Sequence, residues 1–365
     1  MGFRCGIVGL PNVGKSTLFN ALTATGAAQA ENYPFCTIEP NIGRVAVPDP
    51  RLDRIAGLAK SAKIIPTFLD FVDIAGLVRG ASQGEGLGNR FLANIREVDA
   101  IAHVVRCFHG EVHHVEGNVD PLRDMETVDT ELMLADLESL ERRHESAVKR
   151  ARGGDREAKD MLAVTEPALE ALRAGRPARE AAIPADRRAA FRALQLLTAK
   201  PVMYICNVDE DAAATGNDLS AAVEARAKAS GAACVTVSAE IEAQIAGLAD
   251  SAERRDYLES LGLEESGLDR VIRAGYGLLD LITFFTAGPK EARAWTVPAG
   301  TLAPAAAGTI HTDFVRGFIR AETISYEDYV DRGGEQGARD AGRMRQEGRE
   351  YTVRDGDIIL VRFNV

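Results

Sequence analysis

The residues from Gly9 to Thr17 carry the strongest chemical signal in the chain. They read Gly-Leu-Pro-Asn-Val-Gly-Lys-Ser-Thr and match the pattern G-x-x-x-x-G-K-S/T in full. In this pattern the backbone N–H groups of a glycine-rich loop face nucleotide phosphates, and the following helix adds the positive end of its dipole. We therefore expect phosphate contacts at six successive residues: Asn12, Val13, Gly14, Lys15, Ser16 and Thr17.

Three hydroxyl or carboxylate side chains suit a Mg²⁺ ion beside those phosphates. The Ser16 hydroxyl follows the loop lysine, which is the usual place for a magnesium ligand. Asp73 ends an apolar run and begins Asp-Ile-Ala-Gly, a weak pattern that gains meaning from its place after the loop. Thr37 lies where a switch threonine would complete the shell, and the alternative is an ordinary loop residue. We predict Mg²⁺ at Ser16, Thr37 and Asp73.

The segment that should contact the base differs from that of guanine-binding switch proteins. Those proteins use Asn-Lys-x-Asp after a strand, and the aspartate accepts hydrogen bonds from two donors of guanine. In this chain Val208 replaces the lysine and Glu210 replaces the aspartate. Adenine presents a lone pair where guanine presents a proton, so a carboxylate there would be repelled. Base contacts are expected at Asn207, Val208, Glu210, Ser238 and Ala239, of which the last two match a Ser-Ala-x loop that closes over the base.

A strand and a helix must hold the phosphate loop in place. Residues 3–8 form an apolar run before it, and residues 16–22 form an amphipathic run after it. Strands that alternate with helical stretches predict a mostly parallel sheet with helices on both faces, the α/β fold of a P-loop NTPase or G domain. The further predicted strands are 67–72, 101–108, 202–206 and 234–237.

Residues 125–198 break this alternation of strand and helix. Apolar residues recur there at three- and four-residue steps among charged neighbours, which is typical of an exposed helix. Gly153 and Gly154 end the first helical run, and further helices are predicted at 156–173 and 186–197. We expect an antiparallel helical hairpin inserted into a G domain of residues 1–278. The alternative is ordinary packing helices of that same domain.

The chain after residue 278 differs again in its pattern. Glycine and proline mark a boundary between residues 275 and 289, and short strand-like runs follow at 282–285, 294–297, 314–319 and 357–363. These short runs predict a small α+β domain at residues 279–363.

Composition restricts the class of protein further. The chain has 365 residues, of which 46% are hydrophobic and 27% charged, as in globular proteins. The five cysteines include no C-x-x-C pair, and no apolar run is long enough to cross a bilayer, so we expect a cytoplasmic protein without a membrane partner. The net charge of −11 argues against a protein that coats nucleic acid. Residues 131–196, however, hold 13 basic and 12 acidic side chains and could contact RNA.

Four stretches of the sequence resemble the Obg-like ATPases, a family of TRAFAC-class P-loop NTPases called YchF in bacteria and Ola in eukaryotes. They are residues 9–17, 32–41, 73–81 and 293–321. The resemblance covers the whole chain and implies a G domain, a helical coiled-coil insertion and a C-terminal TGS domain of the ubiquitin-like β-grasp type. It also implies slow, Mg²⁺-dependent hydrolysis of ATP in preference to GTP. Association with the large ribosomal subunit or the 70S ribosome, and a role in translation and stress responses, are implied as well.

The group that positions the attacking water differs from that of Ras-type proteins. Those proteins use a glutamine where this chain has Leu77, which cannot hydrogen-bond water. Of His109, His113 and His114, the family pattern selects His114, whose imidazole could bond water at neutral pH. The alternatives are loop histidines without a role, or a zinc site at His109 and His113 that lacks further ligands. An asparagine at the position of Asn12 accompanies K⁺ activation in related switch proteins, so K⁺ is a second candidate cofactor.

Several functions compete at this stage. A regulatory ATPase would dock on the ribosome through the hairpin or the C-terminal domain. The hairpin tip carries five basic residues that could meet rRNA phosphate, or that form a solvated helix end: Lys149, Arg150, Arg152, Arg156 and Lys159. The alternatives are a GTPase that assists ribosome assembly, a small-molecule kinase, and a module that binds ATP without needing its hydrolysis.

Overall fold

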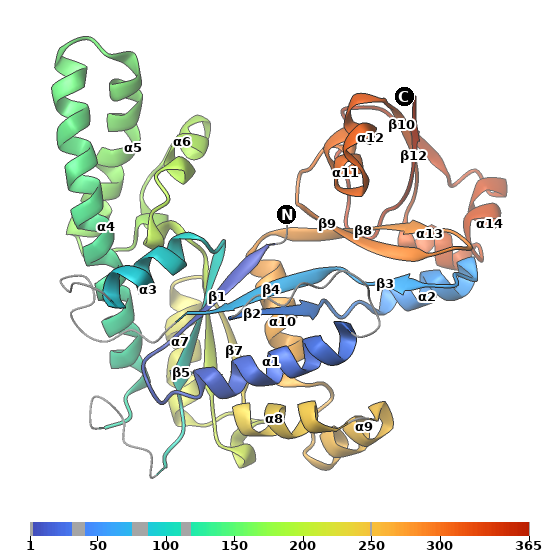
Figure 1. Cartoon of the computed structure of the whole chain (residues 1–365), viewed down its shortest axis with the longest axis horizontal. Helices are drawn as coiled ribbons and strands as arrows, with labels where there is room; N and C mark the ends of the chain where they lie inside the picture. Colours follow the sequence, from blue (N-terminus) through green and yellow to red (C-terminus); the bar gives the residue numbers. More distant parts are fainter. Residues whose placement is uncertain (1–2, 31–40, 75–86, 111–117, 249, 365) are drawn as a thin grey trace. The chain divides into compact units, whose positions relative to one another are not determined.

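The computed structural model describes residues 3–30, 41–74, 87–110, 118–248 and 250–364, and Figure 1 shows their arrangement. The described residues form two compact units. The first takes its residues from 1–25, 37–43 and 70–275, and the second from 26–36, 44–69 and 276–365. No helix in these described ranges is long and apolar enough to cross a membrane.

A six-stranded sheet forms the centre of the first unit. Its strand order is β2 (Ile42–Ala46), β4 (Phe68–Asp73), β1 (Arg4–Val8), β5 (Ala100–Arg106), β6 (Val202–Asn207) and β7 (Ala233–Val237). All neighbours from β4 to β7 are paired in parallel. Every residue of β5 and β6 is buried, as continuous apolar strands of a covered sheet should be. The predicted parallel α/β sheet is confirmed, whereas β2 was not predicted, because its five residues include a glycine and an arginine.

Helices connect the strands of this sheet or follow its last strand, β7. They are α1 (Lys15–Ala30), α3 (Leu87–Arg96), α7 (Asp218–Ala229), α8 (Ala239–Gly247), α9 (Ser251–Ser260) and α10 (Gly267–Leu278). Their starts have local causes. Asn217 and Ser220 form a reciprocal capping box at α7, and the Asp250 carboxylate accepts from the Ala252 N–H at α9.

Two long helices form the hairpin that projects from this unit in Figure 1. They are α4 (Pro121–Arg152) and α5 (Arg156–Arg173). The Arg173 guanidinium lies 2.8 Å from the Glu141 carboxylate, and the His144 ring lies 3.2 Å from the Thr165 hydroxyl. Because 173 contacts 141 while 165 contacts 144, the helices run antiparallel. The predicted hairpin is therefore present, with α4 starting four residues before the predicted 125.

The chain leaves the hairpin through short helical turns rather than through one helix. They are η1 (Ala178–Glu180), η2 (Ala185–Arg187), α6 (Arg188–Ala193) and η3 (Leu197–Ala199). The predicted helix over 186–197 is wrong after residue 193, because Gln195 adopts a positive φ of 52°. The buried Asp136 carboxylate accepts from the backbone N–H groups of Leu197 and Thr198, both at 2.8 Å, and so fixes this return segment to α4.

A second six-stranded sheet forms the C-terminal unit. The order is β11 (Arg345–Glu347), β10 (Phe318–Ile324), β12 (Ile358–Phe363), β8 (Leu281–Ala287), β9 (Ala292–Pro298) and β3 (Ile64–Ile65). Strand β12 runs parallel to β8, which forms an antiparallel hairpin with β9. This mixed sheet is consistent with the β-grasp fold that the resemblance implies. Its helices are α11 (Ala303–Ile310), α12 (Thr312–Arg316), α13 (Tyr326–Asp331) and α14 (Glu335–Asp340).

One predicted strand of this domain is wrong in its first half. Residues 314–316 belong to α12, whose Asp313 N–H is capped by the His311 ring, and β10 starts only at Phe318. Gly317 separates the two elements, and a Cβ there would overlap the backbone oxygen of Asn364. The apolar pattern alone could not show this close approach.

The segment between β2 and β4, which contains a helix and strand β3, also packs in the C-terminal unit, although it lies far from that unit in sequence. Helix α2 (Pro50–Ala59) places Leu52 and Ile55 in one buried cluster with Phe285 and Ile324. Arg51 adds an ion pair to Asp355 at 2.6 Å. The predicted domain limits of 1–278 and 279–363 follow chain order, so they did not include this excursion.

Candidate functional site

The phosphate loop joins the buried strand β1 to helix α1, as its motif requires. Gly9 has no room for a side chain, since a Cβ there would lie 2.7 Å from the Val104 carbonyl oxygen. Gly14 has a φ of +90°, and its Cβ would overlap the Asn207 amide nitrogen. Asn12 also adopts a positive φ, of 65°, which asparagine tolerates better than most residues. The two glycines of the motif are thus needed for close backbone approach and for a left-handed turn.

The structure brings Lys15 and Asp73 together beneath this loop. Strand pairing places Asp73 beside Ile7, next to the start of the loop, and the Lys15 ammonium forms an ion pair with the Asp73 carboxylate. The side chains are only 10% and 21% exposed, so the pair is largely shielded from water. Ser16 lies exposed in the first turn of α1. A carboxylate and a hydroxyl at this end of the loop are the hard oxygen ligands that Mg²⁺ prefers, so the residues fit that ion.

Two predicted site residues lie outside the described residues. They are the proposed metal ligand Thr37 and the proposed catalytic His114. The same holds for Leu77, which stands where Ras-type proteins have their glutamine.

Asn207 connects the phosphate loop to the loop expected over the base. Its side chain is buried at the end of β6. The amide nitrogen donates to the Val13 carbonyl at 3.0 Å, and the amide oxygen accepts from the Ala239 N–H at 2.9 Å. One side chain thus joins three segments that are far apart in sequence, and it does so at the positions predicted for nucleotide contact.

The neighbouring residues are held by their own hydrogen bonds. The Val208 N–H donates to the Val237 carbonyl at 2.9 Å, so this donor is already used within the protein. Glu210 begins the short helix η4 (Glu210–Ala212), and its carboxylate accepts from the Gln244 amide at 2.7 Å. Ser238 is buried, and its hydroxyl has no hydrogen-bond partner in the described part of the chain.

Three residues of this region were not found by sequence reasoning. Arg106 ends β5 almost fully buried, and its guanidinium donates to the Phe108 carbonyl at 3.2 Å, so it fixes the start of the loop that leads to His114. Gln244 and Tyr257 form a hydrogen-bonded chain with Glu210. A charged residue ending an apolar strand was a signal for Arg106, whereas nothing in the sequence pairs Gln244 with Glu210.

A buried carboxylate on α8, the helix that follows the loop expected over the base, connects this helix to α10. Glu242 lies in the first turn of α8 and accepts from the N–H groups of Gly267 and Leu268 at 2.7 and 3.2 Å. Burial raises its pKa to about 6, and these two hydrogen bonds act in the opposite direction. The carboxylate therefore satisfies the free donors at the start of α10.

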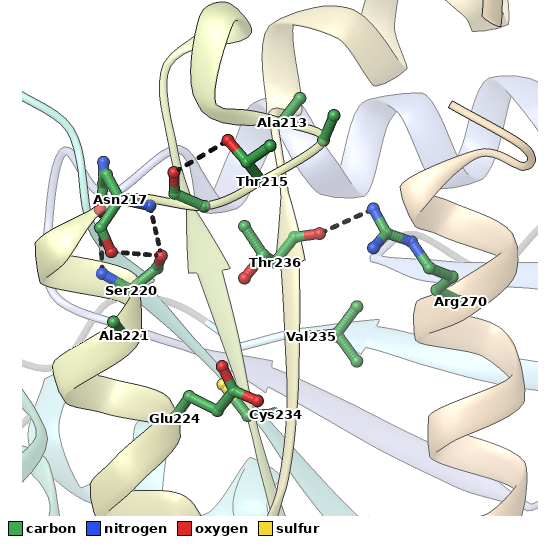
Figure 2. A pocket seen from close by; sticks show the side chains of 12 residues that line it. Ala213, Thr215, Asn217, Ser220, Ala221, Glu224, Cys234, Val235, Thr236 and Arg270 are labelled. Carbon is green, nitrogen blue, oxygen red and sulfur yellow. Dashed lines mark hydrogen bonds between the residues drawn. The ribbon is translucent and has the colours of Figure 1, made fainter. Parts of the chain in front are cut away.

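A separate pocket of about 320 Å³ lies along β7, the last strand of the sheet, and Figure 2 shows it. Arg270 reaches across it from α10 and donates to the Thr236 carbonyl at 2.9 Å (Figure 2). On the other side lies the α7 capping box of Asn217 and Ser220. None of the predicted nucleotide ligands lines this pocket, so it is distinct from the site that the phosphate loop defines.

Comparison with known proteins shows which proteins this chain is similar to. Residues 4–138 match the family model MMR_HSR1, described as a 50S ribosome-binding GTPase. Residues 281–364 match the model YchF-GTPase_C, described as a protein of unknown function. The chain is 57% identical to the ribosome-binding ATPase YchF of Escherichia coli O157:H7 over 366 residues, which cover both chains in full. The chain belongs to the YchF family.

Two further relatives, one from another bacterium and one from a yeast, support this assignment. The ribosome-binding ATPase YchF of Bacillus subtilis is 50% identical over 368 residues and is also covered in full. The solved structure of the Schizosaccharomyces pombe YchF GTPase superposes with a TM-score of 0.89 at 37% identity, covering 99% of this chain and 98% of that one. The resemblance inferred from the motifs is confirmed. The names of the relatives differ on the nucleotide, because the bacterial proteins are named ATPases and the yeast protein a GTPase.

Proposed function

We propose that this protein hydrolyses ATP to ADP and phosphate and works as a ribosome-binding regulatory ATPase in translation and stress responses. The observation that carries the proposal is the full-length identity of 57% to a protein named a ribosome-binding ATPase, together with an intact phosphate loop. A protein that acts on ribosomes would reside in the cytoplasm, as the cysteine usage predicts.

The base end of the site supports adenine rather than guanine. With its N–H bonded to Val237, Val208 offers the base a carbonyl acceptor. Adenine carries an amino donor at the position where guanine carries a carbonyl acceptor, so a carbonyl on the protein favours adenine. The Glu210 carboxylate accepts a hydrogen bond from Gln244, and the Asn207 side chain is hydrogen-bonded to Val13 of the phosphate loop and to Ala239. No lysine stem packs on the base, since Val208 stands in its place.

Mg²⁺ would be held by Ser16, Asp73 and Thr37, and it would neutralise charge that develops on the β- and γ-phosphates. For nucleotide to bind, the Lys15 ammonium must exchange its ion pair with Asp73 for contacts to the phosphates. The loop N–H groups from Asn12 onward orient the phosphates.

Hydrolysis needs a group that positions water, and we assign this role to His114. Because Leu77 cannot form the hydrogen bond, slow turnover is the expected outcome without a partner. Asn12 would assist by holding K⁺ near the phosphates, where the cation supplies positive charge. If exchange of K⁺ for Na⁺ leaves the turnover rate unaltered, the K⁺ assignment is wrong.

The proposal is tested by measuring ATP and GTP affinity and turnover on the full chain, with and without 70S ribosomes. We expect tighter binding of ATP, hydrolysis that depends on Mg²⁺, and co-sedimentation with ribosomes. Failure to bind ATP or ribosomes would overturn it. The second candidate is a GTPase that assists ribosome assembly. It is suggested by the name of the yeast relative, a GTPase, and by the description of the model matched at residues 4–138, a 50S ribosome-binding GTPase, and it predicts that GTP outcompetes ATP.

Contact with rRNA would come from the hairpin tip or the C-terminal domain. The five basic residues of the tip are all exposed: Lys149, Arg150, Arg152, Arg156 and Lys159. Arg150 is partly neutralised by Asp155 at 2.6 Å, so the other four offer more charge to phosphate. Reversing Lys149, Arg152, Arg156 and Lys159 to glutamate should weaken ribosome binding and flatten its salt dependence. Unchanged sedimentation at several salt concentrations would remove the tip from the interface.

A further inference from the structure

A chain of hydrogen bonds restrains the carboxylate that replaces the guanine-reading aspartate. The Gln244 amide nitrogen donates to Glu210 at 2.7 Å, and the Gln244 amide oxygen accepts from the Tyr257 hydroxyl. A glutamine amide has one donor end and one acceptor end. Since the tyrosine hydroxyl occupies the acceptor end, the donor end faces the carboxylate.

The elements that carry this chain are themselves fixed. Gln244 lies on α8, which begins at Ala239, the residue bonded to Asn207. Tyr257 lies on α9 and packs against the buried cluster formed by Ala213, Ile241 and Ile245. Glu210 is three residues after Asn207, whose own position is set by two hydrogen bonds. The restraint on the carboxylate is therefore built on the same frame as the base loop.

We propose that Gln244 is a positioning residue that determines nucleotide specificity. From α8 it binds the Glu210 carboxylate of η4 and so keeps this carboxylate away from the edge of the base. This inference rests on the proposed ATP-binding function. A free carboxylate at this place would accept hydrogen bonds from the N–H donors of guanine and would repel the N1 lone pair of adenine. Restraining it removes a ligand from GTP and a repulsion from ATP, and both effects favour ATP.

The role of Tyr257 follows from the same geometry. Its hydroxyl fixes which end of the Gln244 amide faces Glu210. Without it the amide can turn and present its oxygen to the carboxylate, which removes the restraint for part of the time. The effect of losing Tyr257 should thus have the same sign as the effect of losing Gln244 and a smaller size.

The test measures the dissociation constants of ATP and GTP on the full chain, and the readout is their ratio. Gln244→Leu keeps the side-chain size and removes the amide, so we expect the preference for ATP over GTP to fall about tenfold, which corresponds to one lost hydrogen bond to a charged group. Tyr257→Phe should lower it by a smaller factor. In a Glu210→Ala background, Gln244→Leu should have no further effect, because no carboxylate remains to be restrained.

A matched control is present elsewhere in the chain. Gln336 on α14 is also exposed and donates to a carboxylate, Asp340, at 2.8 Å, so Gln336→Leu makes the same change of side chain away from the nucleotide site. It should leave the ratio of dissociation constants unchanged. If Gln244→Leu and Tyr257→Phe both leave the ratio at its wild-type value while ATP still binds, the inference is wrong and the proposed function stands. If the wild-type chain does not bind ATP, the proposed function fails instead.

Discussion

At the phosphate end of the site, the predicted ligands come mainly from one run of residues around the phosphate loop, whereas the base end is assembled from segments around residues 207 and 239, which Asn207 joins to that loop. Backbone N–H groups and one lysine serve any nucleoside triphosphate. On the proposed function, the base end instead relies on the Val208 carbonyl and on the Glu210 carboxylate, which Gln244 on α8 restrains, so this end can favour one base over another. We therefore expect phosphate binding and choice of base to be separable in this fold, so a substitution at one end should largely spare the other.

The largest effect is expected at the phosphate end, from Lys15→Ala. Loss of the ammonium removes charge-assisted contacts to the β- and γ-phosphates and leaves Asp73 without its partner. We expect ATP and GTP to lose affinity equally, by about a hundredfold, as measured by equilibrium binding. A loss confined to one nucleotide would contradict the separation of the two ends.

Asn207→Ala tests the connection between the ends. The substitution leaves the buried Val13 carbonyl and the buried Ala239 N–H without these hydrogen bonds, which lowers the free energy of unfolding by about 2 kcal/mol. Thermal stability should fall by this amount, and affinity for ATP should fall as well, because the phosphate loop and the base end lose their common anchor. An Asn207→Ala protein with wild-type affinity would show that the bridge does not organise the base end.

The stability of the protein at different pH values tests strand β5 of the sheet that carries both ends of the site. His103 on β5 is fully buried, and desolvation lowers its pKa to about 4. Its unfolded pKa is near 6.5, so the stability from keeping the ring neutral is complete above pH 6.5 and is lost as the pH falls towards 4. The free energy of unfolding should therefore fall by about 2 kcal/mol between pH 7 and pH 4.5 because of this histidine.

The control for this series is His103→Phe, which cannot titrate and keeps a ring against Tyr204, 5.6 Å from His103 between ring centroids. Its unfolding free energy should change less over the same pH range, measured by urea titration at each pH. Equal pH dependence in both proteins would assign the acid sensitivity to other groups.

The smallest effect concerns turnover alone. His114→Ala should leave the affinity for nucleotide intact and lower the hydrolysis rate at least about tenfold, because water positioning contributes this much or more. His109→Ala is the matched control on the same loop, and its rate should stay at the wild-type value. Unchanged turnover in His114→Ala would refute the assignment.

The sequence predicted the phosphate end better than the base end. The loop motif, its strand and its helix are local, so residues 3–22 were sufficient to predict them, whereas Asn207 and Ala239 could only be proposed as base contacts from their place after strands. The Gln244 bond to Glu210 joins residues 34 positions apart on exposed surfaces, and no periodicity reports such a pair. The packing of α2 in the C-terminal unit was missed for the same reason, since Leu52 and Phe285 meet only in three dimensions.

The most direct test of the central claim is competition between ATP and GTP for the wild-type chain, with inorganic triphosphate as a ligand that reports on the phosphate end alone. If the base end selects adenine, ATP should bind at least about tenfold more tightly than GTP, while Lys15→Ala weakens all three ligands. Equal affinities for ATP and GTP, or tighter binding of GTP, would contradict the claim.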